Sequence, residues 1–138
     1  MKKISIAVSI LVIALVIYVV AAVYNSGPSE NSVKHEITKL SSRPDNIKDW
    51  LHSKQISFSA TKAPNTLKNN DPGNSTVYTL KQFGFTDSDL ANASEILDFS
   101  IWTRQEFTLG RPFLRYLLIY DSSGDLLFER SVKFYEFL

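Results

Sequence analysis

The sequence predicts an α+β protein: an N-terminal transmembrane helix, then a small domain of one or two helices on a three- or four-stranded antiparallel sheet that ends in a hairpin. Three observations predict this fold class. An uncharged hydrophobic run occupies Ile4–Tyr24. Two apolar runs of strand length, Phe113–Tyr120 and residues 126–134, flank a cluster of turn residues. Short apolar stripes at helical spacing follow capping residues earlier in the chain.

The hydrophobic run Ile4–Tyr24 has the length of a membrane span. As a helix of about 21 residues it would be about 31 Å long, close to the roughly 30 Å hydrocarbon core of a bilayer. Lys2 and Lys3 precede it, whereas the next basic residue beyond it is Lys34. The positive-inside rule therefore predicts a single-pass signal anchor with a cytoplasmic N-terminus and an extracytoplasmic domain, periplasmic in a Gram-negative cell.

A cleavable signal peptide is the alternative interpretation of this run. Val20, Ala21 and Ala22 supply small residues at a possible cleavage point before Val23. The apolar run is longer than the core of a usual signal peptide, which favours a retained anchor. Both interpretations export the domain, and the length of the uncharged run argues against a buried core helix.

Asn25–Ser32 is rich in Asn and Ser and contains Gly27 and Pro28, which is typical of a linker. Val33, Ile37 and Leu40 then recur at helical spacing and predict a short helix that either packs on the domain or extends the stalk. The predicted parts of the chain are a transmembrane signal-anchor helix at 1–24, a linker or stalk at 25–41, and an extracytoplasmic α+β domain at 42–138.

A first domain helix is predicted from Ser42 to about residue 54. Ser42 with Asp45 three positions later has the pattern of an N-terminal cap and places negative charge in the first turn. Ile47 and Leu51 follow on one helical face.

The next segments are predicted from alternation and turn residues. Residues 56–60 alternate apolar and polar and predict a short strand. Thr61–Ser75 is polar and contains several Pro, Gly and Asn, which predicts a long loop. Thr76–Phe83 is then predicted as a strand that ends at Gly84.

A second helix is predicted after Thr86. Thr86 and Asp89 have the spacing of a capping box. Leu90, Ala93 and Leu97 then form an apolar stripe.

The remaining segments predict strands. Phe99–Phe107 is rich in aromatic and β-branched residues and favours a strand, with continuation of the preceding helix as the alternative. Phe113–Tyr120 and residues 126–134 are the two arms of an antiparallel hairpin, because residues 121–125 between them are turn residues and Gly124 tolerates a positive φ.

Composition excludes several classes of function. The formal net charge is +1 and no run of five or six like charges occurs, which argues against nucleic acid as a partner. The chain has no cysteine. A disulfide framework, a thiolate zinc site, a cysteine nucleophile and a lipoprotein anchor are therefore excluded.

The chain carries no convincing catalytic, metal or cofactor motif. Residues 121–125 resemble the start of a calcium loop, but Val132 occupies the position of the closing glutamate, so a hairpin turn explains them better. Asp49 and His52 are three residues apart on a predicted helix, and two ligands alone do not make a metal site. No Gly-x-Ser-x-Gly or phosphate-binding loop is present. We therefore expect a protein that is not an enzyme and needs no cofactor.

One cluster has the composition of an interaction face, because Trp, Tyr and Arg are enriched where proteins bind one another. The candidate residues are Trp50, Trp102, Arg104, Arg111, Arg115 and Tyr116, with Phe107 and Phe113 beside them. The competing interpretation is that the aromatic side chains fill a small core and the arginines cover its rim.

The sequence therefore favours a membrane-anchored, non-enzymatic binding or assembly protein of the cell envelope, which meets another envelope protein through its hairpin face or the Thr61–Ser75 loop. The alternative is an inhibitor or immunity protein that blocks an exported enzyme or toxin. A small hydrolase would additionally require a pocket with convergent polar groups.

Overall fold

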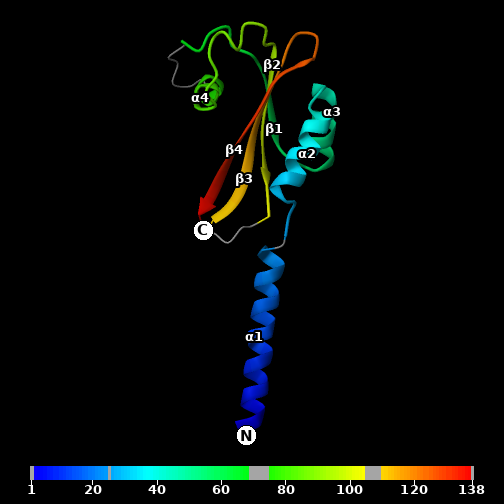
Figure 1. Cartoon of the computed structure of the whole chain (residues 1–138), viewed down its shortest axis with the longest axis vertical. Helices are drawn as coiled ribbons and strands as arrows, with labels where there is room; N and C mark the ends of the chain where they lie inside the picture. Colours follow the sequence, from blue (N-terminus) through cyan, green and yellow to red (C-terminus); the bar gives the residue numbers. More distant parts are fainter. Residues whose placement is uncertain (1, 25, 69–74, 105–109, 138) are drawn as a thin grey trace.

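The computed structural model describes residues 2–24, 26–68, 75–104 and 110–137, and these form four helices and one four-stranded antiparallel sheet (Figure 1). The predicted α+β class and the antiparallel sheet are confirmed. The sheet order is β1-β2-β3-β4, so neighbours in the sheet are also neighbours along the chain. The elements are α1 (Lys2–Tyr24), α2 (Glu30–Leu40), α3 (Pro44–Ser53), β1 (Phe58–Lys62), α4 (Ser75–Gln82), β2 (Glu95–Trp102), β3 (Gly110–Tyr120) and β4 (Leu126–Phe137).

The sheet has a core on each face. Helices α2 and α3 cover one face, and α4 covers the other face at the end away from α1 (Figure 1). Alternation along the strands sends successive side chains to opposite faces. The core under α2 and α3 contains Val33, Ile37, Ile47, Leu51, Leu97, Phe99, Ile101, Leu114, Tyr116, Leu118 and Tyr120. The core under α4 contains Ala63, Leu67, Val77, Leu80, Phe83, Phe85, Leu90, Ile96, Leu117 and Ile119.

Helix α2 lies inside the segment predicted as a linker or stalk, and it belongs to the core. Val33 and Ile37 are both buried against the sheet. The Ser29 hydroxyl caps its N-terminus by accepting from the Ser32 amide at 3.2 Å. The predicted short helix in this segment is therefore confirmed, and it packs on the domain.

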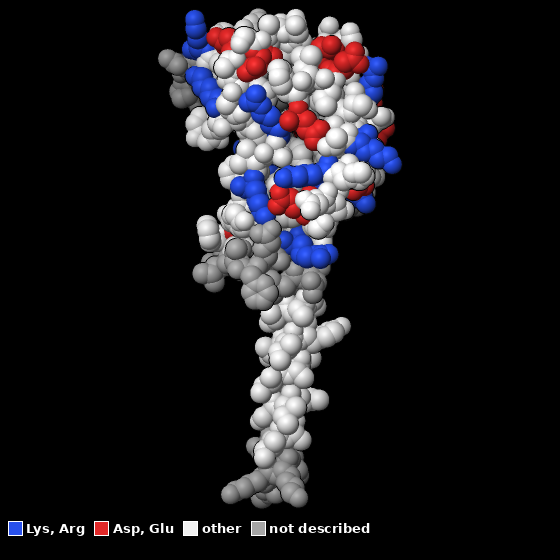
Figure 2. Space-filling model, in the orientation of Figure 1, with Lys and Arg blue, Asp and Glu red and all other residues white. Residues whose placement is uncertain are grey.

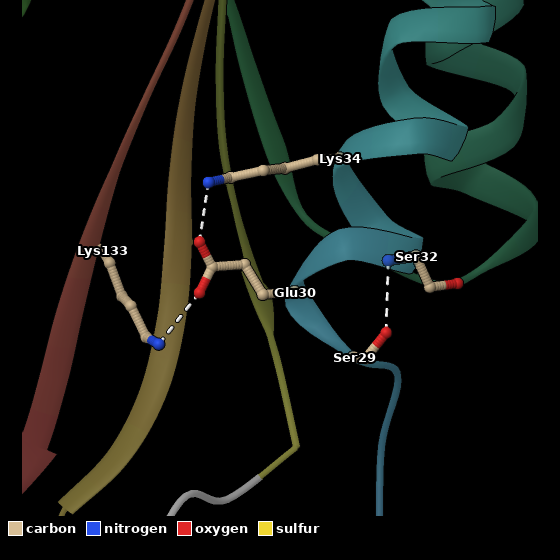
Figure 3. A network of polar contacts seen from close by, with 5 residues as sticks. All are labelled: Ser29, Glu30, Ser32, Lys34 and Lys133. Carbon is tan, nitrogen blue, oxygen red and sulfur yellow. Dashed lines mark hydrogen bonds and ion pairs between the residues drawn. The ribbon is translucent and has the colours of Figure 1, made fainter.

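Glu30 ties the first turn of α2 to the sheet (Figure 3). Its carboxylate accepts from Lys34 Nζ at 2.6 Å and from Lys133 Nζ, on β4, at 2.9 Å. These hydrogen bonds hold the pKa of Glu30 below its ordinary value, and the bond from Lys34 has the largest effect. The chain that arrives from α1 is thus fixed to the last strand as soon as α2 begins.

Helix α3 begins later than the predicted Ser42 cap. Its N-cap is Arg43, which makes no side-chain capping bond, and Pro44 occupies the first turn. The fixed φ of proline suits that position and starts the helix without a hydroxyl cap. The helix ends at Ser53 with Lys54 as its C-cap. Gln55 follows with φ +57°, and the Ile56 amide donates to the Leu51 carbonyl at 2.9 Å.

The predicted strand at Thr76–Phe83 is wrong, because this segment forms α4. Its β-branched residues favoured a strand, but Val77, Leu80 and Phe83 recur every three residues and are all buried. Gly84, predicted as a strand end, follows the helix with φ +76°.

Part of the segment predicted as a long loop, Thr61–Ser75, belongs to a strand or to the core. Its first residues extend β1 to Lys62. Ala63 and Leu67 are buried in the core under α4. The Leu67 amide also donates to the Asp87 carboxylate at 2.6 Å. The centre of the loop, residues 69–74, lies outside the described residues.

The predicted helix after Thr86 is also wrong. Thr86 and Asp89 do make reciprocal capping bonds, with the Thr86 amide donating to Asp89 Oδ2 at 2.8 Å. They close only a series of turns, and β2 begins at Glu95. Leu97 is one of the alternating buried residues of that strand and not part of a helical stripe. The two-residue repeat of a strand, and not the 3.6-residue repeat of a helix, therefore describes this segment.

The strand predicted at Phe99–Phe107 corresponds to β2, which begins four residues earlier and ends at Trp102. The part of the prediction at 105–107 lies outside the described residues. The predicted hairpin is confirmed as β3 and β4, with Gly124 at φ +79° in its turn. Asp121 Oδ1 fixes this turn by accepting from the amides of Ser123 and Asp125.

Helix α1 extends from the domain as a separate rod (Figure 1). The described side chains of α1 that are visible in Figure 2 carry no charge. On the visible face of the domain, by contrast, basic and acidic residues are intermixed (Figure 2). Within the residues that are described, no helix meets both the length and the hydropathy of a membrane span.

Candidate functional site

A groove of about 960 Å³ opens beside the edge of β2. This volume is within the range of ligand sites in proteins. Its walls come from the start and middle of α2, the end of α3, the start of β1, and the final residues of β2. The lining residues are Pro28, Val33, Glu36, Trp50, Lys54, Gln55, Ile56, Ser57, Phe58, Ser59, Asp98, Phe99, Ser100, Ile101, Trp102, Phe113 and Arg115.

The groove exists because β1 is shorter than β2. The chain turns sharply after α3 at Gln55 and enters the sheet only at Phe58, which pairs with Phe99. Strand β2 continues to Trp102 and stays paired with β3 along that length. Among the described residues, no strand lies opposite the last three residues of β2 on the β1 side.

The backbone of this edge points into the groove at alternate residues. The Thr103 amide donates to the Pro112 carbonyl at 3.1 Å, toward β3, whereas the Arg104 amide donates to the Pro28 carbonyl at 2.8 Å, on the opposite side. In an antiparallel ladder both backbone groups of a residue face the same neighbour, and successive residues alternate. Ser100 and Trp102 therefore present their N–H and C=O groups on the same side as Arg104, toward the groove.

Aromatic side chains form the apolar surface of the groove. Trp50 is held in place by its indole Nε1, which donates to Glu36 Oε1 at 2.9 Å and links α3 to α2. Phe58 is fixed by an edge contact with His52, with ring centroids 5.0 Å apart. Trp102 is 39% exposed at the far end of the strand.

An ion pair borders the groove on the α4 face of the sheet. Arg115 donates from Nε to Asp98 Oδ1 at 2.9 Å and from Nη2 to Asp98 Oδ2 at 2.6 Å. The same Nη2 donates to Thr79 on α4 at 3.2 Å. The hydrogen bonds with Asp98 raise the pKa of Arg115 above its ordinary value. The pair therefore fixes both charges at the border of the groove.

The structure distributes the six predicted interaction residues over three environments. Trp50, Trp102 and Arg115 line the groove. Arg104 and Arg111 are exposed at the end of the sheet nearest α1, with the Arg111 guanidinium 4.9 Å from the Trp102 ring centre. Tyr116 is only 1% exposed and belongs to the core under α2 and α3. Of the two aromatic residues named beside them, Phe113 lines the groove and Phe107 lies outside the described residues.

Sequence reasoning missed the backbone of Ser100 and the side chain of Phe58. No side-chain pattern indicates an open strand edge, because the edge depends on where the neighbouring strand begins. The one available signal was the length of the strands, since residues 56–60 predict a strand shorter than Phe99–Phe107.

The described residues contain no group of three or more His, Asp or Glu side chains arranged to hold a metal ion. Asp49 and His52 both lie on α3, and His52 contacts the Phe58 ring.

Comparison of the chain with models of protein families, with curated proteins and with solved structures finds no match.

Proposed function

We propose that the chain is a membrane-anchored, non-enzymatic binding protein of the cell envelope, and that its groove binds an extended segment of another envelope protein as an added β-strand. One observation carries the proposal. No described strand pairs with the outer edge of β2 at Ser100 and Trp102, and this edge lies inside a groove whose walls combine aromatic and polar side chains. Open edges of this kind usually invite pairing with another chain.

The groove suits a strand better than a compact ligand. It is lined from both faces of β2, by Phe99 and Ile101 on one face and by Ser100 and Trp102 on the other. A strand laid along the edge would place alternate side chains on these two faces. The open stretch lies between β1 and the Pro28 carbonyl, which already bonds to Arg104. At about 3.3 Å per residue, a segment of about four or five residues would fill it.

Helix α1 supports the membrane anchor. Its described large apolar side chains are between 47% and 73% exposed and face all directions around the helix. A helix that is apolar all round belongs in a protein core or a bilayer. The uncharged run Ile4–Tyr24 extends beyond the described side chains of α1, residues 6–22, at both ends. Lys2 and Lys3 orient such an anchor with the N-terminus in the cytoplasm.

A matched pair of substitutions tests strand addition. Ser100→Pro removes the groove-facing N–H, and proline is tolerated where that donor takes no part in the ladder. Ser100→Ala changes the side chain and keeps the donor. Both are made in the full-length chain in its native membrane, with a photo-crosslinking amino acid at the groove residue Ser59. A crosslinker at Lys81 on α4, outside the groove, reports background capture.

We expect one envelope protein to be captured from position 59, through a single short segment that mass spectrometry identifies. Capture should persist in Ser100→Ala and fall about tenfold or more in Ser100→Pro, because a lost backbone bond and a clash with the partner strand together cost more than about 1.4 kcal/mol. Equal capture by the two variants would refute strand addition. An exported hydrolase or toxin as the captured protein would favour the inhibitor alternative over an assembly role.

A further inference from the structure

A row of three aromatic side chains crosses the sheet at the end nearest α1. Trp102, Phe113 and Phe134 stand opposite one another on β2, β3 and β4. The ring centres of Trp102 and Phe113 are 5.0 Å apart, and those of Phe113 and Phe134 are 5.4 Å apart in a stacked arrangement. We call these three residues the aromatic row.

The aromatic row is exposed because α4 covers only the other end of the same face. Ile96 and Leu117 on that face are buried under Val77 and Leu80 of α4. Trp102 and Phe134, by contrast, are each 39% exposed. Figure 1 shows α4 at the end of the sheet away from α1, so no helix among the described residues covers the rest of this face.

Exposed apolar side chains concentrate at this end of the sheet. Outside α1, the large hydrophobic residues that the structure describes as exposed are Tyr78, Trp102, Val132, Phe134, Tyr135 and Phe137. All except Tyr78 belong to the halves of β2 and β4 nearest α1. Phe137 is 76% exposed. A concentration of this kind marks a surface that meets another apolar or interfacial phase.

The chain itself holds this end of the sheet close to α1. The Pro28 carbonyl accepts from the Arg104 amide at 2.8 Å, two residues beyond Trp102. Gly27, at φ +97°, passes so close that a Cβ there would stand 3.5 Å from the Arg104 nitrogen. Helix α1 ends at Tyr24, so its end is at most about 14 Å of extended chain from Pro28.

Cationic side chains accompany the exposed rings. The Arg111 guanidinium lies 4.9 Å from the centre of the Trp102 ring, and both Arg104 and Arg111 are exposed. Among the described residues, neither arginine makes an ion pair of 4 Å or less, although Glu136 stands opposite Arg111 in the ladder. Guanidinium groups pair readily with phosphate oxygens.

We infer that this end of the sheet docks on the phospholipid surface of the membrane, with Trp102, Phe134 and Phe137 in the headgroup layer and Arg111 on lipid phosphate. This inference rests on the proposed anchor, because a bilayer that holds α1 must lie at this end of the domain. Trp and Tyr rings favour the membrane interface. The headgroup layer adds about 5 to 7 Å beyond the hydrocarbon, which is within reach of a sheet end held so close to α1.

Tryptophan quenching in vesicles tests the docking. The full-length chain is reconstituted into phosphatidylethanolamine and phosphatidylglycerol vesicles that carry a headgroup nitroxide. Trp50→Phe leaves Trp102 as the only tryptophan. The matched control combines Trp50→Phe and Trp102→Phe with Tyr78→Trp. Its only tryptophan then lies at an exposed site on α4, which covers the far end of the same face of the sheet.

We expect the nitroxide to reduce Trp102 emission about twofold and to leave the emission of the control tryptophan nearly unchanged, because only a ring that reaches the interfacial layer lies close to a headgroup nitroxide. Arg111→Glu should reduce the quenching of Trp102. Extraction with alkaline carbonate on the same vesicles reports the anchor separately. An extractable chain would overturn both the anchor and the docking. A chain that resists extraction but shows equal quenching at the two positions would overturn the docking alone.

Discussion

Replacement of Ile37 by alanine tests whether α2 is part of the domain or only a stalk above the membrane. Ile37 is fully buried in the core between α2, α3 and the sheet. The change removes three carbon atoms, worth about 0.8 kcal/mol each in transfer free energy, and leaves a cavity. We expect the free energy of unfolding to fall by about 3 kcal/mol, within the range measured for such truncations.

Urea unfolding of residues 26–138, followed by circular dichroism, measures this loss. Leu51→Ala on α3 is the positive control, because Leu51 is equally buried in the same core. Lys39→Ala on α2 is the negative control, since Lys39 is exposed and alanine favours a helix. A loss below about 1 kcal/mol for Ile37→Ala, beside a loss above about 2 kcal/mol for Leu51→Ala, would refute the assignment of α2 to the core.

Two further predictions concern titratable groups. Burial raises the pKa of Tyr116 to about 12, so the unfolded chain releases this proton first, from its ordinary pKa of 10. Stability should therefore fall by about 2 kcal/mol between pH 10 and pH 12. Alkaline urea titrations should show this fall. Tyr116→Phe should make it shallower without removing it, because burial also raises the pKa of Tyr120; a slope unchanged by Tyr116→Phe would contradict the prediction. Asp98→Asn leaves the half-buried Arg115 charge without its partner and should destabilise the domain by about 1 to 2 kcal/mol. The loss should be smaller in 1 M salt. A loss that does not depend on salt would contradict its assignment to the ion pair.

Local pattern was sufficient where a turn and two periodic strands stand together in the sequence. The hairpin of β3 and β4 needed only the apolar runs and the turn residues before Gly124. Pattern failed at α4 because Thr76, Val77 and Thr79 have high strand propensity, and the burial of Val77 and Leu80 by the sheet outweighs that preference. Helix formation there is a tertiary effect.

The same limit applies to the candidate site. Composition identified Trp50 and Trp102 as interaction residues, and they do line one groove although they are far apart in the sequence. The open edge between them depends on strand register and on the turn at Gln55, neither of which has a sequence signature. Tyr116 was included with them on composition alone, and alternation along β3 directs it to the core instead.

Trp102 belongs to both proposed surfaces. Its backbone faces the open edge of the groove, and its side chain both lines the groove and joins the aromatic row beside Arg111. A partner strand would therefore be bound directly above the lipid surface, and removal of the Trp102 side chain would disturb both interactions. Ser100→Pro separates them, because it removes only a groove-facing donor. If both proposals hold, Ser100→Pro will abolish partner capture and leave the quenching of Trp102 by headgroup nitroxide unchanged.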